Sequence, residues 1–359
     1  MIKSLFVTFN PIGTEDFGGA QCTQRNLNLL KEVSDPVIYV IKRRSFMSSL
    51  TSFVRGDFPP FKKEDEVNIF DSIKVNDVGL VFVDNSLLGG VVEKIKSKFG
   101  LPVIVFFNNV EYDYVSVRFR HERVRRFLFG KIAKKQEILS LTFADTSIVL
   151  NDRDMGRIEE IYGVKIDYIL PVSFNSIMTK TELQNKYSRI NRGLYKTCLF
   201  VGAYGKANYD GIKWFADVVM PSLERVKLII VGRGFDKFEK EFPNENIEVI
   251  GFVNSLEEYY LKSDFVIAPI FFGAGMKVKI AEAMMYGKSV LGTNEAFEGY
   301  EVDFNKVGAL CNNAESFESE IGILKNLDNK YNEYSRSIFD AKYSSSVTSK
   351  KFKEIFSNL

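Results

Sequence analysis

The stretch Asp264–Thr293, DFVIAPIFFGAGMKVKIAEAMMYGKSVLGT, limits the fold of this chain more than any other segment. An apolar run at 265–270 is followed by a glycine loop, a helical pattern at about 276–286 and a second apolar run at 289–292. This order predicts a strand–helix–strand unit of a parallel sheet, because parallel strands need a crossover connection. The glycine loop then lies at the carboxyl end of a strand, where open α/β sheets bind ligands.

Two lysines stand at the expected start of this helix. Lys277 and Lys279 come shortly after Gly273 and Gly275. A cation in the first helical turn opposes the helix dipole by about 0.3–1 kcal/mol, so an acidic residue is more usual there. The pattern is favourable if an anion, most simply a diphosphate, binds at the helix N-terminus. A solvated helix start that tolerates its lysines is the alternative interpretation.

Short apolar runs alternate with helical patterns along the chain, which predicts the α/β class with doubly wound parallel sheets. The runs expected to be strands in the first half are 4–9, 37–41, 80–84, 103–107, 147–150 and 167–170. The runs expected to be strands in the second half are 198–201, 227–231, 248–253, 265–270, 289–292 and 308–311. Residues 43–73 and 171–196 lack a period, and we predict an irregular insertion and an interdomain connection there.

The length of 359 residues exceeds one ordinary core and predicts two domains of about 150–180 residues each. We expect a first domain at 1–172 and a second domain at 173–343. Both halves read as Rossmann-like, so the ligand is expected between them.

Composition and residue counts exclude several classes of protein. A net charge of +2 gives no basic footprint for nucleic acid. The apolar run 101–107 is too short to cross a bilayer and the N-terminus lacks a signal-peptide pattern, so we expect a cytoplasmic protein. Cys22, Cys198 and Cys311 have no metal or disulfide spacing and are expected to be buried thiols. The single histidine, His121, excludes a His-rich metal site.

Two further cationic glycine loops follow strands of the second half. Gly202 and Gly205 precede Lys206 in the sequence VGAYGK, and Gly232 precedes Arg233 in VGRG. Glycines let the backbone approach a ligand closely, and the cation adds charge for a phosphate. Strand–glycine turns are common in α/β domains, so each loop alone is a weak signal. Three cationic loops at one edge of a sheet predict a phosphate site.

Other candidates lie around these loops. Glu282 stands three residues after Lys279 and either pairs with it or accepts hydrogen bonds from the sugar hydroxyls of a nucleotide. The sequence VIGFV, with Gly251, Phe252 and Val253, would offer main-chain groups to a nucleobase.

In the first half, Gly18 and Gly19 come just before a predicted helix and offer a second approach to the diphosphate. Asn108, Asn109 and Glu111 follow the fourth expected strand, so their polar groups face the ligand. Asparagines at such positions also commonly cap a turn.

The DxD pattern of Asp152 and Asp154 resembles a metal-binding motif of some sugar transferases. We interpret it as the acidic start of a helix, which needs no metal.

The segment 118–135 holds eight lysines and arginines against Glu122 alone, interleaved with apolar residues. A surface helix with snorkelling arginines, which would carry an exposed His121, is one interpretation. Docking onto anionic lipid headgroups, at the inner face of the cell membrane, is the other.

The motifs, and their order along the chain, resemble those of the retaining glycosyltransferases with the GT-B fold that build bacterial surface polysaccharides. This large group is similar to glycosyltransferase family 4. The segments that carry the resemblance are VGAYGKANYDGIKWFADVVMPSL, LIIVGRG, the stretch from VIGFV to VLGT, and FEG. The first half is similar more loosely, through FGGAQ, NNVEYDY and ADTSIVLNDRD. The resemblance implies two Rossmann-like domains facing each other across a cleft, an acceptor-side domain at 1–172 and a nucleotide-sugar-binding domain at 173–343. It also implies a last helix at 344–359 that returns to the first domain.

The activity implied is retaining transfer of a sugar from a nucleotide-sugar, expected to be UDP-linked, to a glycan or lipid-linked acceptor, without metal or cofactor. By motif match, Arg233 and Lys277 would hold the diphosphate and Glu282 the ribose, while Gly19 and Lys206 would add phosphate contacts. The residues assigned to donor binding are Gly18, Gly19, Lys206, Gly232, Arg233, Phe252, Val253, Gly273, Ala274, Gly275, Met276, Lys277 and Glu282. The residues assigned to catalysis are Asn108, Arg233 and Lys277, and those assigned to the acceptor side are Asn109 and Glu111.

The chain departs from this family's pattern at two positions. Many relatives carry a glutamate where this chain has Ala274 and a histidine where it has Asn108. An asparagine forms hydrogen bonds but exchanges no proton near neutral pH. These departures favour, as an alternative, a GT-B-like pseudoenzyme that binds a nucleotide-sugar or a partner transferase without turnover. A nucleotide-sugar epimerase of similar architecture is disfavoured, because the chain lacks a suitable set of histidine and carboxylates.

Overall fold

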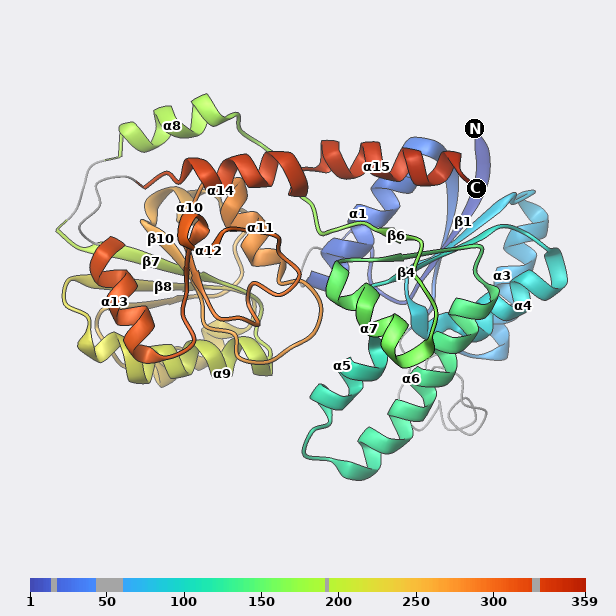
Figure 1. Cartoon of the computed structure of the whole chain (residues 1–359), viewed down its shortest axis with the longest axis horizontal. Helices are drawn as coiled ribbons and strands as arrows, with labels where there is room; N and C mark the ends of the chain where they lie inside the picture. The colour runs from blue at the N-terminus through green and yellow to red at the C-terminus, as the bar shows by residue number, and fades with distance from the viewer. Residues whose placement is uncertain (14–17, 43–60, 191–193, 325–329) are drawn as a thin grey trace. The chain divides into compact units, whose positions relative to one another are not determined.

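The structure, a computed structural model, describes residues 1–13, 18–42, 61–190, 194–324 and 330–359. The chain divides into two compact units, each built around its own parallel sheet (Figure 1). Unit 1 comprises Met1–Pro171 and Ser349–Leu359, and unit 2 comprises Val172–Thr348. Among the described helices, none combines the length and the hydropathy needed to span a bilayer.

The sheet of unit 1 has the strand order β2-β1-β3-β4-β5-β6. The strands are β1 (Ile2–Thr8), β2 (Ser34–Val40), β3 (Leu80–Val83), β4 (Val103–Phe107), β5 (Thr146–Val149) and β6 (Tyr168–Ile169). The helices are α1 (Gly18–Val33), α3 (Lys63–Val75), the short η2 (Ser86–Leu88), α4 (Gly89–Phe99), α5 (Glu111–Arg118), α6 (Arg123–Phe143), α7 (Asp152–Tyr162) and α15 (Ser345–Ser357). The order reverses between β1 and β3, which makes the carboxyl ends of these two strands the topological switch point of unit 1.

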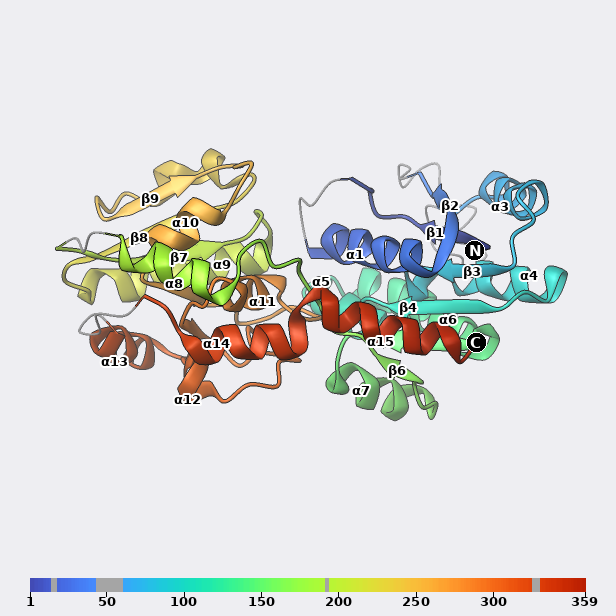
Figure 2. The same cartoon turned by 90° about the horizontal axis from the view of Figure 1, so that it is seen from above.

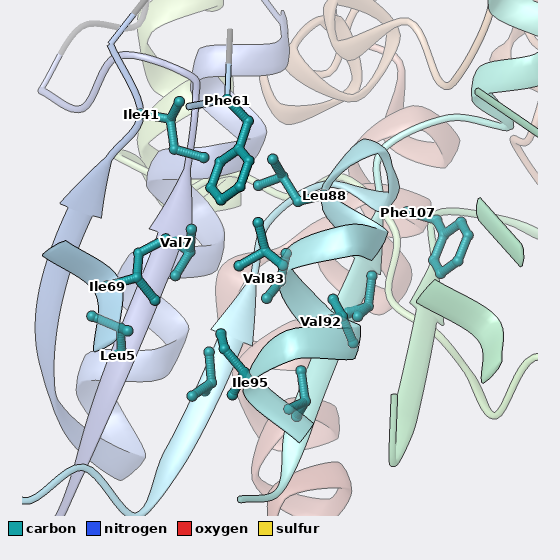
Figure 3. Packing of buried hydrophobic residues seen from close by; sticks show 14 of the residues in the cluster. Leu5, Val7, Ile41, Phe61, Ile69, Val83, Leu88, Val92, Ile95 and Phe107 are labelled. Atoms are coloured by element: carbon teal, nitrogen blue, oxygen red, sulfur yellow. The ribbon is translucent and has the colours of Figure 1, made fainter. Parts of the chain in front are cut away.

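One face of this sheet packs against α3 and α4. Alternate residues of the strands point to this face, among them Leu5 and Val83, and meet Ile69 of α3 and Val92 of α4 (Figure 3). All four side chains are almost completely buried. The continuous apolar strands follow from burial on both faces, which is typical of parallel sheets.

The opposite face of the sheet is covered by α1 and by the last helix, α15 (Figure 2). Phe82 of β3 stacks on Phe6 of β1, and its ring centroid lies 6.2 Å from that of Phe352 in α15. Lys353 also pairs with Glu32 of α1, at 2.8 Å. The end of the chain therefore completes the core of unit 1.

The sheet of unit 2 has the strand order β9-β8-β7-β10-β11-β12, with every pair parallel. The strands are β7 (Lys196–Val201), β8 (Val226–Val231), β9 (Ile247–Ile250), β10 (Phe265–Ala268), β11 (Val290–Gly292) and β12 (Gly308–Leu310). The helices are α8 (Lys180–Ser188), α9 (Lys206–Trp214), η3 (Phe215–Val219), η4 (Met220–Ser222), η5 (Phe235–Glu241), α10 (Glu257–Lys262), α11 (Val278–Met285), α12 (Phe304–Val307), α13 (Ala314–Leu324), α14 (Glu333–Ile338) and η6 (Phe339–Tyr343). Counted from β7, this is the Rossmann order 3-2-1-4-5-6, and its switch point lies between β7 and β10.

These two sheets confirm the predicted α/β class with two Rossmann-like units. Two local predictions were wrong. Of the predicted irregular insertion, residues 43–60 lie outside the described part of the chain. Residues Lys63–Val75, however, form a helix, and the carboxylate of Asp65 caps its start by accepting from the backbone N–H of Lys62 (2.8 Å). The predicted interdomain connection contains α8, which begins with a capping box: Thr179 Oγ1 accepts from the backbone N–H of Glu182, and the Glu182 carboxylate accepts from the backbone N–H of Thr179.

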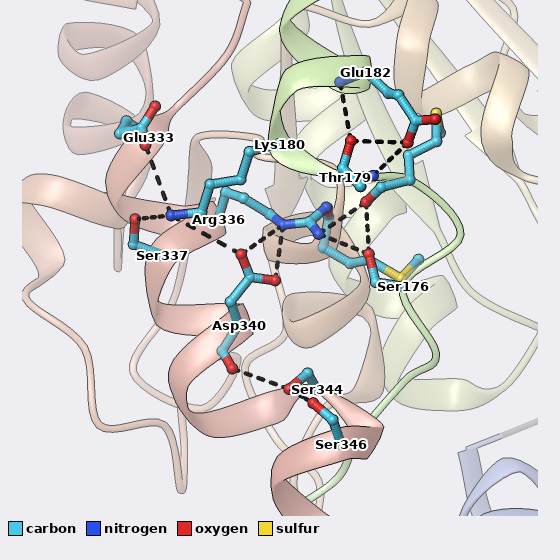
Figure 4. Close-up of polar contacts among 12 residues, drawn as sticks. Ser176, Thr179, Lys180, Glu182, Glu333, Arg336, Ser337, Asp340, Ser344 and Ser346 are labelled. Carbon is cyan, nitrogen blue, oxygen red and sulfur yellow. Dashed lines mark hydrogen bonds and ion pairs between the residues drawn. The ribbon is translucent and has the colours of Figure 1, made fainter.

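A buried arginine fixes the segment before α8 within unit 2 (Figure 4). The guanidinium of Arg336, in α14, donates to Ser176 Oγ (2.7 Å), to the Met178 carbonyl (2.9 Å) and to the carboxylate of Asp340. It also donates to the carbonyl of Met285, the last residue of α11 (2.7 Å). Since hydrogen bonds to a charged group are each worth about 1.5–3 kcal/mol, this network holds a polar segment in place.

Candidate functional site

The switch point of unit 2 brings two of the predicted glycine loops together. β7 and β10 are neighbouring parallel strands, so the loop that follows β7 and the loop that follows β10 begin at the same edge of the sheet. The first holds Gly202 and Gly205, and the second holds Gly273 and Gly275. Open α/β sheets bind ligands at this position.

The third loop, after β8, packs against the first. A Cβ atom at Gly232 would lie 1.8 Å from the carbonyl oxygen of Gly202, so only glycine allows this approach. The amide of Tyr204 donates to the carbonyl of Arg233 (2.8 Å). The guanidinium of Arg233 lies over the ring of Phe252, 4.5 Å from its centroid. Phe252 follows β9 and is 60% exposed, as is suitable for stacking on a planar group.

Lys277 lies one residue before α11 rather than in its first turn, because the helix begins at Val278. Its ammonium forms an ion pair with Glu295 (2.5 Å) and donates to the carbonyl of Gly275 (2.8 Å). Gly275 has a φ of +64°, in the left-handed region that favours glycine. The ammonium is thus held inside the loop, beside Gly273, where a Cβ atom would lie 3.2 Å from Lys277 Cε. The sequence had not indicated Glu295 as a site residue.

Lys279 is the more buried of the two lysines and is 7% exposed. Its Nζ donates to Asn208 Oδ1 of α9 (2.7 Å) and lies over the ring of Phe200, 4.1 Å from the centroid. Burial, and after it the nearby Lys277, lower the pKa of Lys279 to about 7, against the opposing effect of Glu282. Within the described residues, Lys279 thus donates to Asn208 and does not form the alternative ion pair with Glu282.

The remaining candidates of unit 2 lie around these groups. Glu282 accepts a hydrogen bond from the hydroxyl of Tyr260 (3.1 Å). Lys206, the first residue of α9, pairs with Asp210 on the same helix (2.7 Å) and its side chain is largely exposed. Met276 is buried. Ala274 and Val253 lie in the loops that follow β10 and β9.

In unit 1, Gly18 and Gly19 are the first residues of α1, after the strand β1. The loop residues 14–17 before them lie outside the described part of the chain.

Asn108 follows β4 and reaches the neighbouring strand. Its Nδ2 donates to the carbonyl of Asp84, just after β3 (2.9 Å), while its Oδ1 is buried and has no hydrogen-bond partner among the described residues. Asn109 and Asn85 both donate to Glu111 Oε1, at 3.5 and 3.2 Å. Glu111 is buried, which raises the pKa of its carboxyl group.

Two buried carboxyl groups of unit 1 were missed by the sequence reasoning. Asp84 lies at the switch point and accepts hydrogen bonds from Thr8 (3.1 Å), Asn26 (2.6 Å) and Thr23. Burial raises the pKa of Asp84 to about 6, against the effect of these donors. The sequence signal for Asp84 is a polar residue at the end of a buried strand, which is the same signal that indicated Asn108.

Glu137 of α6 is the second missed carboxyl group. It accepts the backbone N–H groups of Glu111 (2.8 Å) and Tyr112 (3.1 Å), at the start of α5, and the hydroxyl of Tyr162 (2.6 Å). Burial raises the pKa of Glu137 to about 7. Its role is to cap α5 from a distance, a non-local contact that sequence spacing does not indicate.

The acidic pair of the DxD pattern lies at the start of α7. Asn151 is the cap, and its side chain accepts from the backbone N–H of Asp154 (2.9 Å). Asp154 in turn accepts from Asn151 Nδ2 (3.0 Å), and Asp152 lies in the first helical turn. The three predicted thiols, Cys22, Cys198 and Cys311, are free and buried.

The basic segment 118–135 begins at the last residue of α5, Arg118, and continues through a turn into α6, which starts at Arg123, where one helix had been expected. The two helices pack against each other, and the first turns of α6 are exposed (Figure 1). Val124 is 72% and Phe127 60% exposed, and both stand among arginines and lysines. Lys131 lies over the ring of Phe127, 4.3 Å from its centroid. The α6 patch, defined as Arg123–Lys135, thus presents apolar and cationic groups together.

The glycine loops of unit 2 lie in a stretch that matches a known protein-family model. Residues 195–326 match the model of the family described as Glycosyl transferases group 1. No curated protein matches the chain in sequence.

Solved structures resemble the whole chain in fold. Sucrose-phosphate synthase (tll1590) from Thermosynechococcus elongatus is similar at a TM-score of 0.76 and 13% identity, over 100% of this chain and 99% of that one. Anabaena Alr3699/HepE in complex with UDP and glucose is similar at 0.70 and 13%, over 100% of both chains. The apo form of the lipopolysaccharide outer core galactosyltransferase WaaB is similar at 0.68 and 14%, again over 100% of both. At such identities the likeness establishes the fold, which is that of the GT-B glycosyltransferases.

Proposed function

We propose that this protein is a glycosyltransferase that moves a sugar from a UDP-sugar to a glycan or lipid-linked acceptor in surface polysaccharide synthesis. The observation that carries the proposal is the set of cationic glycine loops at the switch point of unit 2, inside the stretch that matches the glycosyl transferase group 1 model. The neighbour crystallised with UDP and glucose supports a uridine nucleotide as the donor.

The diphosphate of the donor would lie against the loops that follow β7, β8 and β10. In this proposal, Arg233 and Lys277 bind its oxygens, and Gly202 and Gly232 allow the close approach. Glu282 would bind the ribose hydroxyls and Phe252 the nucleobase. Negative charge builds up on the diphosphate as it leaves, so preorganised cations stabilise the transition state more than the ground state.

Transfer would proceed with retention and without metal or cofactor. The bond between the anomeric carbon and the diphosphate oxygen breaks, and a bond to the acceptor oxygen forms on the same face of the sugar. The departing diphosphate takes the proton of the acceptor hydroxyl, so Asn108 need not act as a base. Asn108 would instead bind the sugar through its unpartnered Oδ1, and Asn109 and Glu111 would lie on the acceptor side.

A lipid-linked acceptor would place the enzyme at an anionic membrane surface. We propose that the α6 patch makes this contact at the inner face of the cell membrane. The exposed side chains of Val124 and Phe127 would enter the headgroup region. The surrounding lysines and arginines would attract anionic lipids, and each such cation contributes about 1 kcal/mol to the binding free energy.

The test is release of nucleoside diphosphate by the purified protein from a panel of nucleotide-sugars, with and without glycan and lipid-linked acceptors. We expect UDP release that depends on a UDP-sugar, rises with acceptor and persists in EDTA. Loss of activity in EDTA would contradict the metal-independent mechanism. Binding without release would indicate the pseudoenzyme, which Asn108 and Ala274 favour. A product with inverted anomeric configuration would contradict retention.

A further inference from the structure

Lys279 bridges the switch point of unit 2. It is the second residue of α11, which follows β10, and its Nζ donates to Asn208 Oδ1 in α9, which follows β7 (2.7 Å). Asn208 Nδ2 donates in turn to the carbonyl of Ala203 in the loop between β7 and α9 (2.8 Å). A Cβ atom at Gly202 would lie 2.9 Å from Lys279 Nζ, so the amine lies directly against this glycine loop.

The amine of Lys279 is buried among uncharged groups. Its direct contacts are the Asn208 amide and the ring of Phe200, and within the described ranges no carboxylate forms an ion pair with it. The charged groups that act on it are Lys277, which precedes α11, and Glu282, on α11 itself. A buried cation without a counter-ion is unfavourable, so this amine is close to losing its proton at neutral pH.

We propose that Lys279 is a positioning residue that takes up a proton when a diphosphate binds to the adjoining glycine loops, and so makes donor binding depend on pH. This inference rests on the proposed function, since it needs a diphosphate at the switch point. The ligand brings the negative charge that the free protein does not place beside Lys279, and this charge favours the ammonium form. Proton and ligand then strengthen each other's binding by the same factor.

The sign of the effect follows from this linkage. Below pH 7 Lys279 is already charged and binding needs no extra proton. Above pH 7 the amine is neutral in the free protein, so the complex must acquire a proton. The affinity for a diphosphate therefore falls as the pH rises, by up to about tenfold per pH unit.

The experiment is titration calorimetry of the full chain with UDP-glucose, at pH 7 to 9 and in two buffers of different ionisation enthalpy. UDP-glucose is chosen because both of its phosphates are esterified, whereas a terminal phosphate itself titrates with a pKa of about 6. ADP-glucose and GDP-mannose are titrated in parallel. At pH 8 we expect uptake of up to about one proton per ligand.

Two variants assign the proton to Lys279. Lys279→Met keeps a chain of similar length without the charge, and it should bind with no proton uptake and no decline in affinity between pH 7 and 9. Asn208→Asp places a carboxylate at the amine, which keeps Lys279 charged and should also abolish uptake at pH 8. Asn208→Asp serves on its own if Lys279→Met fails to fold. Lys213→Met removes a lysine of α9 that pairs with Asp217 and should leave the uptake unchanged.

The outcomes separate this inference from the proposed function. Binding of UDP-glucose without buffer-dependent heat overturns the role of Lys279 and leaves the glycosyltransferase proposal standing. Uptake that persists in both variants also overturns it. If the wild-type protein binds none of the three nucleotide-sugars, both proposals fail.

Discussion

At the residue scale, the ion pair of Lys277 with Glu295 gives the proposed diphosphate site an internal counter-ion. The ammonium is largely buried and lies 2.5 Å from the carboxylate. A diphosphate that binds Lys277 must compete with Glu295, because both offer anionic oxygens to one ammonium group. The pair therefore keeps the cation in place before the ligand arrives.

We expect Lys277→Gln to lower kcat for UDP release by about 10²–10³-fold, as removal of a preorganised charge usually does. Glu295→Gln is the matched change on the other side of the pair. It should raise the thermal stabilisation by UDP above that of the wild type, because Lys277 then lacks its counter-ion until the ligand binds. Both effects are measured by UDP release and by the shift of Tm with UDP. Full turnover in Lys277→Gln, with Lys262→Gln as an exposed control, would contradict the phosphate assignment.

Asp84 of unit 1 predicts a pH dependence of stability. Burial raises the pKa of Asp84 from 3.8 to about 6, so the folded protein binds this proton more tightly than the unfolded chain does. The free energy of unfolding should therefore fall as the pH rises from about 4 to about 6, by at most about 3 kcal/mol, and stay low above that range. Asp84→Asn removes this contribution.

The check is urea unfolding of the wild type, Asp84→Asn and the exposed control Asp71→Asn at pH 4.5 and 7.5. The difference in stability between the wild type and Asp84→Asn should change with pH, in favour of the variant at pH 7.5. Parallel pH profiles of these two proteins would show that Asp84 is not a titrating group of the folded core.

At the element scale, the glycine-loop units were predictable and the polar helices were not. The loop and helix around Lys277 follow from apolar runs and glycines that are local in sequence. In α8, only Leu183 and Tyr187 are buried, so its periodicity is too weak to distinguish a helix from a linker. Glu295 was missed because its partner, Lys277, is remote in sequence, and spacing does not report such a contact. Asp84 stands at the end of a buried strand, a local signal that sequence reasoning used for Asn108 but not for Asp84.

The α6 patch gives a prediction at the same scale. The double variant Val124→Ser, Phe127→Ser should bind less to vesicles that contain anionic phosphatidylglycerol, because its apolar contact with the headgroup region is lost. Co-sedimentation measures this, with phosphatidylcholine vesicles as the neutral surface. Ile138→Ser, which changes an exposed apolar residue of α6 outside the patch, is the control. Equal binding of the wild type to both kinds of vesicle would contradict the role of the patch.

At the scale of the whole molecule, the two units differ in how the chain builds them. Unit 2 is continuous, whereas unit 1 takes its last helix from the far end of the sequence. Phe352→Ala should therefore destabilise unit 1 by about 3–5 kcal/mol, the usual loss for a buried phenylalanine, without affecting unit 2. Hydrogen exchange measures this effect: the backbone amides of β1 and β3 should exchange faster in the variant, while the exchange rates of β7 and β10 amides should not change. Lys351→Ala, on the exposed side of α15, should change neither, and equal loss of protection in both units would contradict the division.

This division has a consequence for biosynthesis. A ribosome makes the sheet of unit 1 first, yet the apolar surface around Phe82 stays uncovered until the residues after Thr348 have been translated. All of unit 2 is translated between the sheet of unit 1 and the last helix, so unit 2 can fold while unit 1 still lacks that helix. Chaperones that bind exposed apolar surface have that whole interval in which to hold the unfinished unit.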